Sequence, residues 1–113
     1  MNLNEFIEKN NIAIFVKANL KVKSFDIIKR DLELESYYLF EQLIIYGSVD
    51  NLMKSIEGQI LPAIWTQGNT KCIVCRPHKN MIVVLFYDSY LDVKDEYYHA
   101  KELDSLIKEL QEE

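Results

Sequence analysis

Three apolar, strand-like runs separated by short turns constrain the fold of this chain more than any other feature of its sequence. They span residues 60–66, 71–76 and 81–87, and the segments between them, 67–70 and 77–80, contain the turn-favouring residues Gly, Asn and Pro. Connections this short can join only antiparallel neighbours. The sequence therefore predicts a three-stranded antiparallel meander.

Pro62 indicates where the first of these strands lies in the sheet. Proline lacks the amide hydrogen that a central strand donates to its neighbour. We therefore expect this strand to lie at a sheet edge or to begin after Pro62. The run 81–87 is apolar at nearly every position, which is typical of a central strand buried on both faces.

Residues 33–57 have the periodicity of a long helix with two apolar groups on roughly opposite sides. We expect the first group to cover the sheet. The second group needs a partner, because leaving it in solvent would expose a contiguous apolar patch. The first group is Leu34, Tyr38, Ile45, Val49, Leu52 and Ile56, and the second is Leu39, Phe40, Leu43 and Tyr46.

Gly47 leaves two structures open for this segment. A continuous or kinked helix would place Gly47 where another backbone can approach closely. Alternatively, Gly47 and Ser48 break the helix, and Ser48 caps a second one. We favour the continuous or kinked helix. Gly47 then joins the second apolar group and Pro62 in a predicted dimer or partner interface.

The N-terminal segment is predicted to form a helix and a hairpin. Residues 3–9 have apolar positions at helical spacing, and the apolar run 12–17 fits a buried strand. After a turn at residues 18–19, strict alternation over residues 20–23 predicts a second strand with one solvated face.

The last segment, residues 95–113, is predicted to form an amphipathic helix. His99 lies on its apolar stripe, where partial burial explains it more simply than catalysis. The element order α-β-β-α-β-β-β-α predicts an α/β fold with one antiparallel sheet flanked by helices. With 113 residues, the chain is expected to form a single domain, residues 1–113.

The charge distribution argues against nucleic acid as the partner. The net charge is −5, and residues 88–113 carry 9 acidic and 3 basic residues. The positive clusters are small, whereas nucleic-acid binding needs a basic stripe. No apolar run approaches the length of a membrane span, and the first residues do not resemble a signal peptide. These features predict a cytoplasmic protein.

Cys72, Cys75 and His78 invite a metal or redox interpretation. In a strand, however, residues three apart point to opposite faces of the sheet, which disfavours both a zinc site and a redox pair. We therefore expect reduced, unligated cysteines, with no metal and no cofactor.

Other candidates for catalysis have simpler explanations. The acidic pairs Asp88/Asp92 and Asp95/Glu96 fit a solvated loop before a helix N-terminus, where the helix dipole favours negative charge. The sequence contains no glycine-rich phosphate or dinucleotide motif and no nucleophile elbow. The chain is therefore expected not to be an enzyme.

The element order, the length and the final meander resemble the roadblock/LC7 superfamily over essentially the whole chain. The runs that carry the resemblance are LPAIW at 61–65, KCIVCRP at 71–77 and MIVVLF at 81–86. The resemblance implies a five-stranded antiparallel sheet ordered 2-1-5-4-3, with the long helix on one face and the terminal helices on the other. The turn at residues 18–19 departs from the glycine-containing turn of the family.

Members of that superfamily typically dimerise through the long helix and the third strand, and they serve as platforms for small Ras-like GTPases or as adaptors. The resemblance thus implies a homodimeric or heterodimeric, non-enzymatic scaffold, with no catalytic residues to carry over. Profilin, longin and PAS-like proteins share related sheets, so a small-ligand sensor is the alternative, which requires an apolar cavity with a few polar groups. A small enzyme is a third possibility.

Overall fold

The computed structural model describes the backbone of residues 1–112 and the side chains of residues 1–110. The elements are α1 (Leu3–Lys9), β1 (Ile14–Asn19), β2 (Ser24–Lys29), α2 (Tyr38–Phe40), the π-helix η1 (Glu41–Ile45), α3 (Val49–Ser55), β3 (Ala63–Gln67), β4 (Thr70–His78), β5 (Met81–Asp88) and α4 (Val93–Glu112). The last helix is predicted to end at Glu113, and this residue lies outside the described residues.

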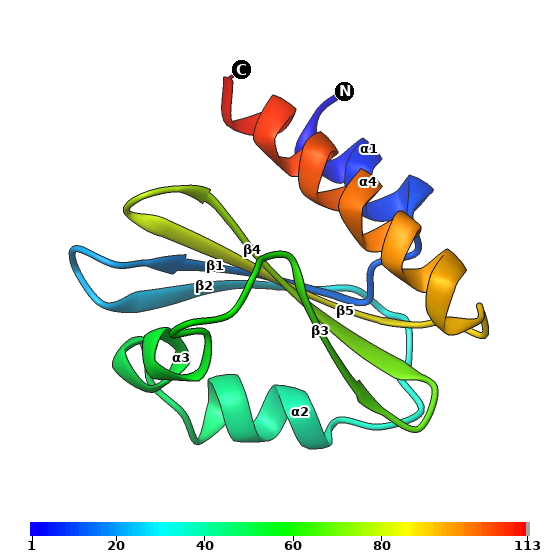
Figure 1. Cartoon of the computed structure of the whole chain (residues 1–113), viewed down its shortest axis with the longest axis horizontal. Coiled ribbons are helices and arrows are strands. Elements are labelled where there is room, and N and C mark those ends of the chain that lie inside the picture. Colours follow the sequence, from blue (N-terminus) through cyan, green and yellow to red (C-terminus); the bar gives the residue numbers. More distant parts are fainter. Residues whose placement is uncertain (113) are drawn as a thin grey trace.

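The strands form one antiparallel sheet in the order β2-β1-β5-β4-β3, which confirms the predicted order. Helices α1 and α4 cover one face, and α2, η1 and α3 cover the other (Figure 1). Strand β3 lies at an edge and begins directly after Pro62, as expected from the missing amide hydrogen. Strand β5 pairs with both β1 and β4 and is buried along most of its length.

Each face of the sheet supports its own apolar core. The core under α2, η1 and α3 includes Phe40, whose ring meets that of Phe86 edge-on at 5.4 Å between centroids. The other core packs residues such as Phe6 and Leu103 from α1 and α4 against the sheet. Side chains alternate along each strand, so one strand supplies both cores.

The predicted second strand of the first hairpin is wrong. Residues 20–23 form the turn, and the strand is β2, which follows it. The Asn19 side chain accepts hydrogen bonds from the backbone N–H groups of Lys21 and Val22 at 3.0 and 3.2 Å. Lys23 closes the turn with a φ of 55°. Side-chain-to-backbone bonding by asparagine thus outweighs the alternating pattern, which was too short to specify a strand.

The favoured continuous helix over residues 33–57 is also wrong, and the alternative is confirmed. The helical layer begins at Tyr38, and α3 starts afresh after Ser48, whose hydroxyl accepts from the Asn51 N–H at 3.1 Å. Between these two points the chain forms a π-helix that ends with the Tyr46 N–H bonded to the Glu41 carbonyl at 2.8 Å.

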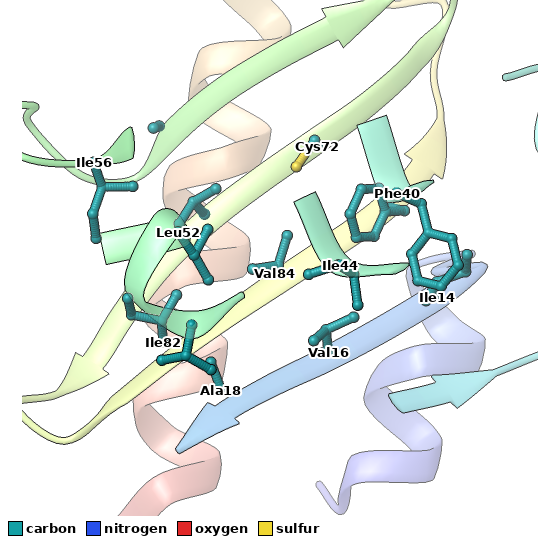
Figure 2. Close-up of a cluster of buried hydrophobic side chains, with 14 of the residues drawn as sticks. Ile14, Val16, Ala18, Phe40, Ile44, Leu52, Ile56, Cys72, Ile82 and Val84 are labelled. Carbon is teal, nitrogen blue, oxygen red and sulfur yellow. The ribbon is translucent and has the colours of Figure 1, made fainter. Parts of the chain in front are cut away.

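The π-helix and the break change which side chains face the sheet. A π turn takes up more residues than an α turn, so a stripe calculated for a single α-helix loses its phase. Phe40 and Ile44 point into the core (Figure 2), whereas Tyr38 and Ile45, both assigned to the sheet-covering group, are exposed. Val49, Leu52 and Ile56 are buried as expected, as is Leu34 in the preceding loop.

Gly47 is required by the close return of the chain at the end of η1. A Cβ at this position would lie 2.7 Å from the Leu43 carbonyl carbon, closer still to its oxygen, and 2.9 Å from the Gln42 oxygen. These are backbone atoms, which no side-chain rotation can move.

We expect Gly47→Ala to lower the free energy of unfolding by about 2–3 kcal/mol because the backbone must shift to admit the methyl group. Gly58→Ala is the matched control: Gly58 has a φ of +76° but open space around its Cβ position. Its expected loss is about 1 kcal/mol, from the left-handed backbone alone. Urea unfolding of both variants measures the difference, and an equal or smaller loss in Gly47→Ala would contradict the steric argument.

The last helix starts at Val93, slightly earlier than expected. The Asp92 carboxylate caps it by accepting from the Asp95 N–H at 2.8 Å. His99 is half-buried, and its ring meets the Tyr87 ring edge-on at 5.6 Å between centroids. The predicted partial burial of His99 is confirmed. Among residues 1–112, no helix combines the length and the apolar character needed to cross a membrane.

Candidate interaction surface

The outward side of α2 and η1 carries a cluster of apolar side chains in solvent. Tyr38, Ile45 and Tyr46 are 56%, 51% and 73% exposed, and Leu39 and Leu43 beside them are half-buried against the core. We call these five residues the helical patch. Tyr38 and Ile45 are absent from the predicted interface. The Gly47–Ser48 break was the sequence signal that could have identified them, because it invalidates a single stripe.

The structure separates the predicted interface residues into different environments. Phe40 is only 6% exposed, so assigning it to an exposed apolar face is wrong: it packs on Phe86 beneath the helix. Tyr46 is the most exposed member, and Gly47 lies half-buried at the break. Pro62 is half-buried at the start of the β3 edge.

The area of the helical patch limits what it can bind alone. Its three exposed side chains present on the order of 350 Å². A stable protein–protein interface buries about 800 Å² on each partner. The outer edge of β3 lies next to α2 and extends the surface (Figure 1), with Trp65 half-buried on the same face of the sheet.

A buried carboxylate links α4 to the end of β5. Glu96 is 4% exposed, and it accepts from the Tyr87 hydroxyl at 3.0 Å and from the Ser89 hydroxyl at 2.9 Å. The expectation that the Asp95/Glu96 pair is solvated is wrong for Glu96, which lies at the start of α4 and is buried against the end of β5. Burial, followed by the negative charge of Glu96, raises the pKa of Tyr87 above its ordinary value. The cluster therefore holds the start of α4 against the end of β5.

A second polar cluster fastens the loop before α2 to the sheet. The Thr70 hydroxyl donates to Asp88, whose other oxygen accepts from the Glu35 N–H at 2.8 Å. The Ser36 N–H donates to the Thr70 hydroxyl at 3.0 Å. Each of these groups makes a hydrogen bond that holds the loop to the sheet. Asp88 and Asp92, which were candidates for a catalytic pair, have separate roles, because Asp92 caps α4.

Cys72 and Cys75 are buried on opposite faces of β4, as expected from their spacing. Burial raises the pKa of both thiols, and the negative charge of Asp104 contributes at Cys75. A buried, protonated thiol is a poor nucleophile and a poor metal ligand. His78 lies at the end of β4, where its Nδ1 accepts from the Asn80 N–H at 3.1 Å. Among the side chains of residues 1–110, no group of three or more metal-ligating residues converges.

The strand order, with α1 and α4 on one face and α2, η1 and α3 on the other, defines the roadblock/LC7 fold. Among solved structures, the chain is similar to Myxococcus xanthus MglB, a protein of this fold, with a TM-score of 0.54 and 9% sequence identity. The alignment covers 96% of this chain and 89% of MglB. No protein-family model and no curated protein matches the sequence.

Proposed function

We propose that residues 1–113 act as one roadblock/LC7-like domain, a non-enzymatic, dimeric cytoplasmic scaffold that binds another protein. The observation that carries the proposal is the helical patch, with its two exposed tyrosines and Ile45, together with the unpaired edge of β3, which contacts α2. A two-fold pair would bury the same patch twice and bring the two β3 edges together. The fold of the chain supports this arrangement, because roadblock-like proteins typically pair through these elements.

The partner class proposed for the dimer is a small Ras-like GTPase, as the family resemblance implies. The polar clusters support a non-enzymatic role, because Glu96, Asp88 and Thr70 are each engaged in holding elements together. A small-ligand sensor would need an apolar cavity. A groove of about 310 Å³ lies beside β2, on the opposite face of the sheet from the helical patch, and it is open to solvent rather than enclosed.

Tyr46→Asp is expected to raise the dimer dissociation constant at least about 30-fold, because a two-fold interface would bury the new carboxylate twice. Tyr46 is preferred to Leu43 for this test, since Leu43 also packs on the core and an aspartate there would threaten folding. The matched control is Tyr90→Asp, at another exposed tyrosine in the loop before α4. Light scattering across a dilution series measures the mass.

Three outcomes distinguish the parts of the proposal. A wild-type chain that is monomeric at micromolar concentration, or a Tyr46→Asp variant as dimeric as Tyr90→Asp, would contradict the helical interface. A monomer that is purified with a bound small molecule would favour the sensor. A dimer that binds none of the host's Ras-like GTPases, loaded with either GDP or a GTP analogue, would contradict only the partner class.

A further inference from the structure

The edge strand β2 presents unpaired backbone groups to solvent. It lies at one end of the sheet, with β1 as its one neighbour. Next to it, the Arg30 N–H donates to the Ala13 carbonyl at 2.9 Å. The Arg30 N–H therefore points towards β1. Because backbone N–H groups alternate in direction along an antiparallel strand, those of Phe25, Ile27 and Lys29 point away from β1. These three positions can bond to an additional strand.

Grooves lined by both apolar and charged side chains flank this edge on both faces of the sheet. Ile28 borders the groove of about 310 Å³ between the β1–β2 hairpin and the terminal helices, with Leu3 and Phe15 in its lining. On the opposite face, a shallower groove of about 420 Å³ lies between Lys29 and Ile45. Successive side chains of an added strand would point alternately into the two grooves, which is how strand addition gains specificity.

The apolar character of β2 is unusual for a free edge. Ile27 and Ile28 are 43% and 39% exposed and point to opposite faces of the sheet. Natural proteins usually protect such edges with charge, bulges or covering elements, because an open apolar edge pairs with other chains. The edge of β2 is regular through its whole pairing with β1.

The charge around this edge selects the occupant. Residues 14–30 carry five basic side chains and a single acidic one, Asp26, in a chain whose net charge is −5. Lys23 is paired with Asp50 at 3.1 Å, whereas no ion pair involving the other four basic residues is present among the described residues. Two copies paired through β2 would bring these basic hairpins together, and like charges would oppose the contact.

We propose that β2 is a second docking site, which accepts an extended segment of a partner protein with an apolar centre and acidic flanks as an additional strand. The backbone of Phe25, Ile27 and Lys29 would supply the hydrogen bonds, the two grooves would take alternate apolar side chains, and the basic hairpin would attract the acidic flanks. Because β2 and β3 form opposite edges of the sheet, a strand added at β2 leaves the β3 edge free. One residue of the helical patch, Ile45, lines one of the two grooves.

The probe is the capped octapeptide EEVFVIEE, and the matched control is KKVFVIKK, which has the same apolar centre. By NMR titration of the full chain, the acidic peptide is expected to bind at least about tenfold more tightly than the basic one. Amide exchange at Phe25, Ile27 and Lys29 is expected to slow at least about tenfold in the complex, because the three N–H groups become hydrogen-bonded.

Two kinds of variant test the backbone and the charge separately. Ile27→Pro removes an outward N–H while leaving the bonds to β1, and it is expected to abolish binding of the acidic peptide. Lys21→Glu/Lys29→Glu is expected to weaken binding at least about fivefold, against less than about twofold for Lys94→Glu/Lys101→Glu. The control pair is matched because Lys29 and Lys101 each lie over a tyrosine ring, at 5.1 and 5.4 Å.

The proposal is overturned if the basic peptide binds as tightly as the acidic one, if neither peptide binds at millimolar concentration, or if protection appears at β3 instead of β2. It is also overturned if Ile27→Pro changes the oligomeric state of the protein in the absence of peptide, since the β2 edge would then pair copies of this chain. If Ile27→Pro fails to fold, the two double lysine variants decide the question. The proposal is refuted if both variants weaken binding of the acidic peptide equally.

Discussion

Replacing Phe40 with alanine is expected to lower the free energy of unfolding by about 4 kcal/mol. Phe40 is 6% exposed, lies under the junction of α2 and η1, and meets Phe86 edge-on. The substitution removes an aromatic pair and leaves a cavity between the helical layer and the sheet (Figure 2). A loss of this size is a large part of the 5–15 kcal/mol, roughly, that stabilises an ordinary domain.

Tyr46→Ala is the matched comparison, because Tyr46 lies on the same helical segment but is 73% exposed. Its expected effect on the unfolding free energy is within about 0.5 kcal/mol. Urea unfolding of both variants at one low protein concentration separates core from surface, since dimerisation would otherwise add to stability. If Phe40→Ala lowers the free energy of unfolding by less than about 1 kcal/mol and also weakens self-association, Phe40 is an interface residue and not a core residue.

The second large effect is expected at alkaline pH, where the free energy of unfolding should fall by about 4 kcal/mol per pH unit above pH 10. Burial raises the pKa of Cys72, Cys75 and Tyr87 above their ordinary values of 9.0 and 10.0. The unfolded chain therefore loses these three protons while the folded chain keeps them. Stability is complete below about pH 9 and is lost as the pH rises, at about 1.4 kcal/mol per unit for each group.

Chemical denaturation at pH 8, 9, 10 and 11 measures this slope. Cys72→Ala should reduce it by about one third, because one of the three raised groups is removed. Below pH 9 both thiols should react with thiol reagents only as fast as the chain opens. A free energy of unfolding that stays constant between pH 8 and 11 would show that these three groups titrate in the folded protein as they do in the unfolded chain.

The meander and the terminal helices could be predicted from the sequence because their signals are local. The runs ending at Thr66, Arg76 and Tyr87 alternate with turn residues over distances that permit only antiparallel pairing. Because Pro62 lacks an amide hydrogen, it predicts that the strand lies at an edge or begins after it, and β3 does both. The spacing of Cys72 and Cys75 likewise places them on opposite faces of any strand, whatever lies above it.

The periodicity of the sequence could not predict which side chains of α2, η1 and α3 face the sheet, because contacts with the sheet decide this. Phe40 and Ile44, four residues apart, share the sheet-facing side of the first helical segment, and the break at Gly47 lets α3 begin with a phase of its own. This change of phase leaves Tyr38 and Ile45 exposed as part of the helical patch. The periodicity of one unbroken helix therefore predicts the wrong sides for Phe40 and Ile45.

Length, apolar spacing, turn chemistry and the position of one proline determined the class of fold and the order in which its elements follow one another. Tertiary structure alone decided which faces of those elements are free. The burial of Glu96, the turn at residues 20–23 and the open edge of β2 each depend on where neighbouring elements lie. Local signals specify a backbone conformation, whereas an exposed surface is defined by what the rest of the chain leaves uncovered.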